Sequence, residues 1–221
     1  MAIQKPLLAG LVASLLMAQC AFADLVTASF NTKTGSASGA FYSLTVPVSQ
    51  SGVTFDATLS VIGSGNIHTS TAGLGVVGNG PNAVSNGEFL YLSMSVANVV
   101  GGTASFDGFK TASLTSSGVN DTVVFSLDPI IPTTGDNFYT GTNSQAAPIN
   151  IDSLTGGNLP QSFFAIAAPI TPGDGGNAFR LGGVIGQFTV AAVPEPTAFL
   201  FGSLVAGSVG MVVARRRRAR K

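Results

Sequence analysis

The sequence predicts an all-β protein, a two-sheet β-sandwich of jelly-roll or immunoglobulin-like type, with a targeting segment at each end. Three observations predict this fold. Several short segments alternate between apolar and polar residues, clusters of glycine and asparagine separate them, and no stretch of the central chain has a 3.6-residue apolar period. Of the 221 residues 45% are hydrophobic and only 9% are charged, so we expect a domain surface rich in Ser, Thr, Gly and Asn.

The alternation is clearest over Val53–Val61, where apolar residues take every second position and Thr, Asp or Ser take the positions between them. Leu90–Val96 and Val123–Leu127 repeat this pattern. A period of two places one face of a strand in the core and the other face in water. Further strands are expected at Leu25–Phe30, Ala40–Val46, Thr103–Phe106, Thr111–Thr115, Phe163–Ala167, Ala178–Leu181 and Val184–Val190.

Clusters of glycine, asparagine and proline mark the turns between these strands. They are Gly63–Asn66, Gly78–Asn82, Asn86–Gly87, Gly101–Gly102 and Pro172–Gly176. The long segment Pro129–Pro160 is expected to be loop with short strands. Residues 24–192 are therefore predicted to form one β-sandwich ectodomain, long enough to bury a core of its own.

The N-terminus has the three parts of a secretory signal peptide. Lys5 supplies a positive charge, residues 6–18 form an apolar run, and Ala21 and Ala23 make an A-x-A cleavage site. We expect residues 1–23 to be removed as a signal peptide, so that the mature chain starts at the next residue. An uncleaved anchor is the alternative, although the apolar run is shorter than the roughly 20 residues of a membrane span.

The C-terminal segment 193–221 also has three parts. The motif Val193-Pro194-Glu195-Pro196 comes first, and residues 197–214 follow it without a charge. As a helix these residues rise about 27 Å, close to the hydrocarbon thickness of a bilayer. The basic tail 215–221 then ends the chain with Arg215, Arg216, Arg217, Arg218, Arg220 and Lys221. We expect a transmembrane helix at 197–214 and a tail that stops transfer and stays in the cytoplasm, with a buried core helix as the alternative.

This arrangement resembles the PEP-CTERM sorting signal of exported bacterial proteins, in which a V-P-E-P motif, an apolar helix and an Arg-rich end follow one another. The resemblance implies processing by an exosortase, a membrane-embedded Cys protease-transpeptidase, with Pro194, Glu195 and Pro196 as its recognition residues. Each proline fixes its own φ and biases the residue before it away from helix, so the motif is expected to be an extended peptide. A stiff linker above the membrane is the alternative interpretation.

The resemblance further implies a single-pass inner-membrane precursor that is later sorted to the cell surface or extracellular matrix of a bacterium that makes exopolysaccharide and biofilm. Exosortase and exopolysaccharide are the expected partners, and the membrane is contacted through residues 197–214 before processing. The domain also resembles the sandwich domains that often precede this signal, at Gly73–Val76, Phe106–Phe109 and Phe179–Leu181. Those domains mostly lack an assigned activity, so this second resemblance bears on fold.

The distribution of charge argues against a nucleic-acid-binding domain. The chain has ten basic and ten acidic residues, but six of the ten basic residues lie in the last seven positions. The domain itself keeps three basic residues and nine acidic ones, a formal net charge of −6. It therefore repels nucleic acid and anionic lipid.

Candidate catalytic residues are few. Cys20 is expected to leave with the signal peptide. His68 is the only histidine and the chain has no G-x-S-x-G motif, so we expect a polar turn residue. Gly73–Gly78 matches G-x-G-x-x-G, but Pro81 follows where a helix is needed, so the match predicts a glycine-rich strand and turn. The acidic residues are expected in solvated loops, without the paired geometry of a glycosidase.

Oxygen ligands for calcium are present in the turns at Asp136-Asn137 and Asp174–Asn177, without an EF-hand or nonapeptide pattern. Asp and Asn in turns usually bond the backbone. We therefore expect no catalytic residue, no metal site and no cofactor, and calcium stays an open alternative.

Threonine pairs separated by one residue stand at 32–34, 69–71 and 140–142. An ice-binding surface needs a flat and regular array of threonine. Because the three pairs are scattered and differently spaced, they do not predict such a surface.

These observations together predict an exported protein without enzymatic activity, with a structural or adhesive role in biofilm or exopolysaccharide. A carbohydrate-binding module is one alternative. It needs a row of exposed aromatic residues, and the domain has Tyr42, Tyr91 and Tyr139 but no Trp. A secreted hydrolase, which needs two converging carboxylates, and a single-pass periplasmic protein that retains its anchor are the others.

Overall fold

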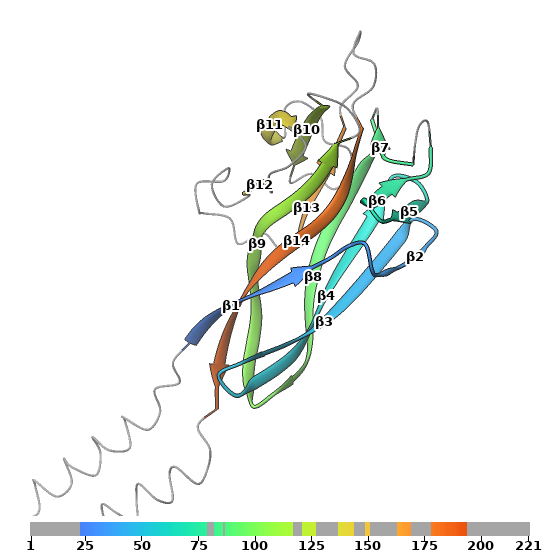
Figure 1. Cartoon of the computed structure of the whole chain (residues 1–221). Helices are drawn as coiled ribbons and strands as arrows, with labels where there is room; N and C mark the ends of the chain where they lie inside the picture. The colour runs from blue at the N-terminus through green and yellow to red at the C-terminus, as the bar shows by residue number, and fades with distance from the viewer. Residues whose placement is uncertain are drawn as a thin grey trace, which may run out of the picture. The chain divides into compact units, whose positions relative to one another are not determined.

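The computed structural model (Figure 1) describes residues 23–78, 82–85, 87–116, 121–126, 137–143, 149–150, 163–168 and 178–193. Contacts divide the chain into a body, Asp24–Val190, and a unit made of the two ends, Met1–Ala23 and Ala191–Lys221. Of the ends, the description covers Ala23 and residues 191–193. No helix within the described ranges is long and apolar enough to cross a membrane.

The described body is all-β, and its strands form two antiparallel sheets. The first, sheet A, has the order β12-β9-β14-β6-β5, with β1 and β7 also paired to β14. Its strands are β1 (Ala23–Phe30), β5 (Ile67–Ser70), β6 (Gly73–Val76), β7 (Val84–Ser85), β9 (Gly102–Ser116), β12 (Ile149–Asn150) and β14 (Ala178–Ala192).

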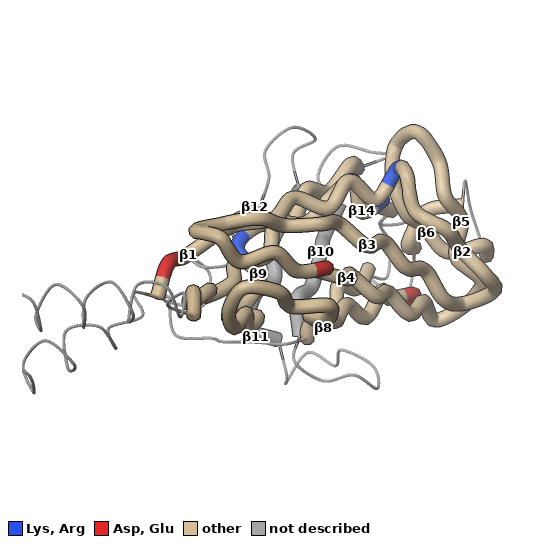
Figure 2. Tube along the Cα trace, turned by 90° about the horizontal axis from the view of Figure 1, so that it is seen from below, with Lys and Arg blue, Asp and Glu red and all other residues tan. Residues whose placement is uncertain are grey.

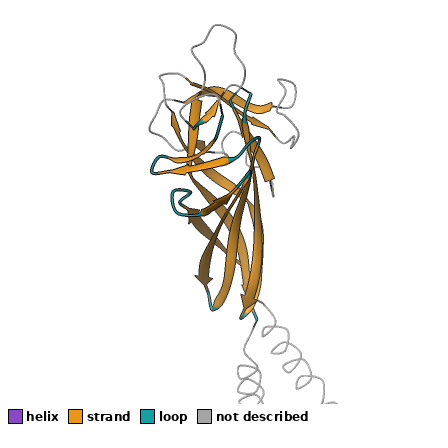
Figure 3. Cartoon of the chain, turned by 90° about the vertical axis from the view of Figure 1, so that its right-hand side faces the viewer, coloured by secondary structure: helices purple, strands orange, loops and turns teal. Residues whose placement is uncertain are grey.

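The second, sheet B, has the order β11-β10-β13-β8-β4-β3-β2. Its strands are β2 (Ser36–Ser38), β3 (Phe41–Gln50), β4 (Val53–Gly63), β8 (Phe89–Val100), β10 (Asp121–Ser126), β11 (Asn137–Asn143) and β13 (Phe163–Ala167). The connections from β8 to β9, from β9 to β10 and from β13 to β14 each pass from one sheet to the other. Figure 3 shows the long strands of both sheets running along the body.

Aromatic side chains join the two sheets. Phe55 of β4 meets Phe188 of β14 with ring centroids 5.2 Å apart, and Phe109 of β9 meets Phe164 of β13 at 4.8 Å. Phe106 of β9 contacts both Phe109 and Phe188. The Phe55–Phe188 and Phe109–Phe164 pairs connect strands of opposite sheets, so the two sheets pack face to face, whereas the two contacts of Phe106 lie within sheet A. Rings at such distances add about 0.5–1.5 kcal/mol each beyond their burial.

The register of β3, β4 and β8 sets the faces of sheet B. β3 pairs with β4 from Phe41 opposite Ile62 to Gln50 opposite Val53, without a break. β8 pairs with the other edge of β4, and the register shifts once, between Thr54 and Asp56. Residues that stand directly opposite one another project to the same side, so each pair of the register is either inward or outward as a unit.

Two glycines allow another segment of backbone to cross close to β6. Gly73 has a φ of 125°, in the region that favours glycine. A Cβ at Gly75 would stand 2.0 Å from the carbonyl oxygen of Asn82. The G-x-G-x-x-G match is thus a strand followed by a bend, as the sequence predicted.

Most predicted strands are confirmed, among them β4, β8, β1 and β13. Two predicted breaks are wrong, because Thr103–Phe106 and Thr111–Thr115 belong to the single strand β9, and Ala178–Leu181 and Val184–Val190 belong to β14. β9 and β14 are neighbours in sheet A, so pairing between them keeps each strand extended through the glycine-containing residues at its middle. The prediction for His68 is also wrong, because it lies in β5 opposite Gly75 and not in a turn.

Candidate binding face

The outward side of β3, β4 and β8 carries two rows of hydroxyl groups. One row crosses the three strands through Ser43, Ser60 and Ser93, and the next crosses them through Thr45, Thr58 and Ser95. All six side chains are exposed or half-buried. We call these six residues the hydroxyl face: Ser43, Thr45, Thr58, Ser60, Ser93 and Ser95.

Regular strand pairing gives the hydroxyl face its geometry. Neighbouring strands lie about 4.8 Å apart, and alternate residues of one strand lie about 6.7 Å apart. The Oγ1 atoms of Thr45 and Thr58 are 2.9 Å apart, which is a hydrogen bond between the two strands. The hydroxyl groups therefore form a two-dimensional grid on a broad sheet surface.

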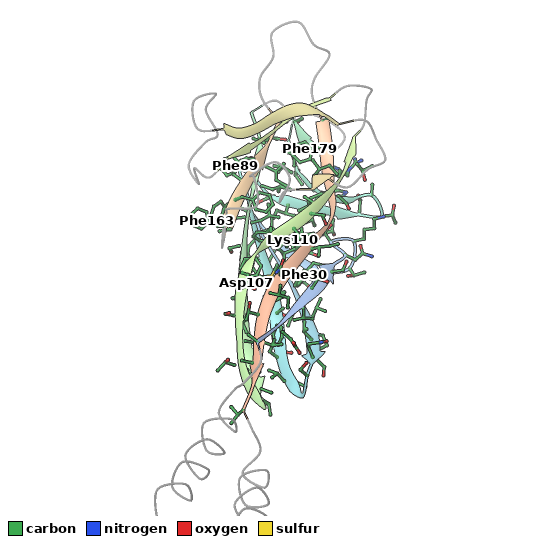
Figure 4. The ribbon with its side chains drawn as sticks, turned by 90° about the vertical axis from the view of Figure 1, so that its left-hand side faces the viewer. Phe30, Phe89, Asp107, Lys110, Phe163 and Phe179 are labelled. Carbon is green, nitrogen blue, oxygen red and sulfur yellow. The ribbon has the colours of Figure 1, made fainter. Side chains whose placement is uncertain are left out.

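An apolar row borders the hydroxyl face. Phe41, Ile62 and Tyr91 stand opposite one another across the same three strands, and Phe41 and Ile62 are 45% and 47% exposed. Phe163 of β13 packs against Tyr91, with centroids 5.7 Å apart and an interplanar angle of 37°. Figure 4 shows Phe163 projecting from the edge of the ribbon. Phe163 stands opposite Ser93, beside this row, and we call Phe41, Ile62 and Tyr91 together with Phe163 the apolar row.

The face carries little charge. Asp56 is the one charged residue in β3, β4 and β8, and it accepts a hydrogen bond of 2.7 Å from Asn98 Nδ2. Figure 2 shows the few charged positions scattered over the tube. The Tyr91 phenol is neutral at physiological pH because its ordinary pKa is 10, and burial raises that pKa further. The face therefore presents neutral hydrogen-bonding groups beside one exposed ring, Phe41, and two half-buried rings, Tyr91 and Phe163.

A groove of about 350 Å³ forms a second feature, on sheet A between β1, β9 and β14. Its polar lining comes from Ser29, Asn31, Lys33, Ser113 and Thr115. Beside it, the buried Thr32 donates a hydrogen bond to the carbonyl oxygen of Leu181, which fastens the segment after β1 to β14. Lys33 is the only charged residue in the lining, so the groove contains no pair of carboxylates.

The described acidic side chains mostly bond to neighbouring strands or turns. Glu88 accepts hydrogen bonds from the backbone N–H and the hydroxyl of Ser85, and Asp107 accepts one from Thr189. In the described part of the chain, no three His, Cys, Asp or Glu side chains come together as a metal-binding group. The calcium candidates at Asp136 and Asp174 are not among the residues described.

The structure describes little of the predicted sorting site. Ala23 is exposed at the start of β1, and Val193 is 62% exposed just after β14. The other predicted residues, which are Ala21, Pro194, Glu195, Pro196 and the basic residues of 215–221, lie outside the described residues, as does 197–214.

The sequence patterns predicted the strands β3, β4 and β8 but did not predict that their polar residues align as the hydroxyl face. The hydroxyl groups come from three strands, so no T-x-T pair within one strand marks them. A comparison of the Ser and Thr residues at the polar positions of Val53–Val61 with those of Leu90–Val96 could have identified this face from the sequence. Comparison of the chain with protein-family models, with curated proteins and with solved structures finds no match.

Proposed function

We propose that this protein is exported, is sorted through a PEP-CTERM-type signal at 193–221 and has an adhesive or structural role in a cell-surface or extracellular polysaccharide matrix. Exosortase is the processing partner and exopolysaccharide the matrix partner. The proposal includes a jelly-roll or immunoglobulin-like sandwich as the finer fold class. Consecutive described strands repeatedly lie in different sheets, as β1 and β2, β4 and β5, and β8 and β9 do, which is the arrangement of a two-sheet sandwich of either type.

The observation that carries the adhesive role is the hydroxyl face beside the apolar row. Each Ser or Thr hydroxyl donates one hydrogen bond and accepts two, which matches the hydroxyl groups of a neutral sugar. Half-buried rings such as Tyr91 and Phe163 each offer an apolar face for the C–H side of a sugar ring. Many weak contacts on one grid suit the repeating units of a long polysaccharide, because a linked chain engages several positions at once.

Retention on the host's own isolated exopolysaccharide tests the adhesive role. The Ser95→Glu variant places a charge on the hydroxyl face, and Thr27→Glu places the same charge on an exposed strand position of sheet A. We expect Ser95→Glu to weaken co-sedimentation with the polysaccharide about tenfold, equivalent to roughly 1.4 kcal/mol, and Thr27→Glu to leave it unchanged. Equal retention of both variants would exclude the hydroxyl face as the adhesive surface.

Mass spectrometry of the C-terminal peptide tests the sorting step. Matrix and membrane fractions are compared between the host and a strain that lacks its exosortase. We expect a chain that ends near residues 194–196 in the matrix, and a full-length chain held in the membranes of the mutant. A chain ending at Lys221 in the membranes of both strains would identify a single-pass periplasmic protein that retains its anchor.

A carbohydrate-binding module with a defined glycan is the second candidate, and the Tyr91–Phe163 pair favours it. Loss of binding in Tyr91→Ala on a glycan array, with one glycan class standing out in the unmodified protein, would support this candidate. Retention in the matrix without binding to any arrayed glycan would support the adhesive role and exclude the carbohydrate-binding module.

A further inference from the structure

Three exposed aliphatic side chains gather at one end of the body. Val99 and Val100 end β8, and they are 37% and 66% exposed. Leu25, near the start of β1, is 66% exposed. We call Leu25, Val99 and Val100 the apolar tip. None of these three side chains belongs to the buried core, so packing of the core does not explain why these positions are apolar.

The turn between β3 and β4 brings these residues together. Ser51, in that turn, donates a hydrogen bond to the carboxylate of Asp24, next to Leu25. Val100 stands opposite Thr54, and a Cβ at Gly101 would lie 2.3 Å from the carbonyl oxygen of Gly52. Leu25 and Val100 therefore flank the same turn. Figure 1 shows the start of β1, the turn between β3 and β4 and the turn between β8 and β9 at this end of the body.

An irregularity in β8 directs the valines outward. The register between β4 and β8 shifts near Asn98, which has a φ of 52° although it is not glycine. Its side chain is held by the 2.7 Å hydrogen bond to Asp56. A bulge bends the strand and changes the direction of the residues beyond it, which here are Val99 and Val100. A strained backbone conformation thus supports the exposure of two apolar side chains.

The chain also leaves the body at this end. Thr189 of β14 bonds to Asp107 of β9, and the two strands are neighbours, so the last residues of β14 lie beside the first part of β9. The four residues 193–196 then connect β14 to the apolar segment 197–214. Four extended residues span at most about 14 Å, so the apolar segment begins within this reach of the end of β14.

We propose that the apolar tip docks on the outer surface of the lipid bilayer while the chain is anchored by its C-terminal segment. This inference rests on the proposed membrane-anchored precursor. Among residues 23–26, 48–54 and 96–105, Asp24 is the only charged one, and the nearby carboxylate of Asp56 is occupied by its hydrogen bond from Asn98. The tip therefore inserts by burying aliphatic groups among the lipid headgroups, and it does not need anionic lipid. Docking holds residues 193–196 at the membrane surface, where the proposed membrane-embedded exosortase acts.

The chain has no tryptophan, so a single introduced Trp reports its own surroundings. The full chain carrying Val100→Trp is reconstituted in nanodiscs of phosphatidylcholine and in matched nanodiscs with brominated acyl chains. Phe41→Trp is the control, because Phe41 is also apolar and 45% exposed but lies at the far end of β3, about 30 Å along the strand from the turn. We expect brominated lipid to reduce V100W emission about twofold and to leave F41W emission unchanged.

Emission of V100W that brominated lipid does not quench overturns the docking inference. If that emission is shifted to the blue without quenching, the tip is covered by protein, such as a second copy of the chain, and the lipid assignment is wrong. Incorporation into nanodiscs is measured separately by co-elution. If the chain fails to incorporate, both the proposed anchored precursor and the docking inference are wrong. If the chain incorporates but the probe is not quenched, only the docking inference is wrong.

Discussion

The two faces of β3, β4 and β8 share one backbone and have opposite chemistry. The inward face of β4 is fully or almost fully buried and consists of Val53, Phe55, Ala57, Leu59 and Val61. The outward face of the same strands carries the hydroxyl face, the apolar row and a single charge. Stability therefore comes from the inward face, whereas the outward face makes few packing contacts and is free to bind.

The largest test of this comparison is to remove a ring that joins the sheets. Phe188 is fully buried and contacts both Phe55 and Phe106. We expect Phe188→Ala to lower the free energy of unfolding by about 3–5 kcal/mol, because it removes burial and leaves a cavity. Urea denaturation measures this change. A loss below about 1 kcal/mol would mean that the two sheets do not depend on this contact.

The next test concerns close approach of backbone in sheet A. A Cβ in Gly75→Ala would meet the Asn82 carbonyl oxygen at 2.0 Å, so the neighbouring segment must move. We expect a loss of about 2–3 kcal/mol in stability. The matched control is Gly182→Ala, whose Cβ would find its nearest atom at an ordinary 3.5 Å. We expect the free energy of unfolding of this control to stay within about 0.5 kcal/mol of the unmodified protein. Equal losses in both variants would mean that the close approach of backbone at Gly75 is not the cause.

A smaller effect is expected for the buried phenol of the inward face. Tyr42 is fully buried, and its hydroxyl oxygen accepts a hydrogen bond of 3.1 Å from the Gly35 N–H. Tyr42→Phe removes the acceptor, and we expect a loss of about 1–2 kcal/mol at pH 7. Thermal unfolding of both proteins measures it.

The same phenol predicts a dependence on alkaline pH. Burial raises the pKa of Tyr42 above 10, and the hydrogen bond from Gly35 lowers it by less. The folded state therefore favours the protonated phenol, so its contribution is complete below pH 10 and is lost as the pH rises through the folded-state pKa. We expect Tyr42→Phe to lose less stability than the unmodified protein between pH 9 and 11. The Tyr42→Phe variant still loses some stability over this pH range, because burial also raises the pKa of Tyr91.

The smallest effect on stability belongs to the outward face. Thr58→Ala removes an exposed hydrogen bond to Thr45, and we expect a change within about 0.5 kcal/mol in the free energy of unfolding. Polysaccharide retention is expected to fall in the same variant. A stability loss as large as that of Phe188→Ala would show that the outward face also holds the fold.

Much of the sandwich was predictable because alternation is a local property. The nine-residue pattern from Val53 to Val61 predicted β4, and its inward residues are buried as expected. His68 was misassigned because polar neighbours suggested a turn, whereas pairing with β6 makes the segment a strand. Likewise, Gly182 and Gly183 suggested a break that the neighbouring strands of sheet A override.

The local sequence is sufficient to predict which side chains of β4 and β8 face the core, because a period of two follows from strand geometry alone. It also determined the composition of the two ends, on which the sorting proposal rests. Which strands are neighbours, by contrast, depends on contacts between distant parts of the chain. Ser93 reaches its row beside Ser60, and Phe163 reaches Tyr91, through pairing between segments distant in the chain. The hydroxyl face and the apolar tip exist because of long-range register, which no local pattern encodes.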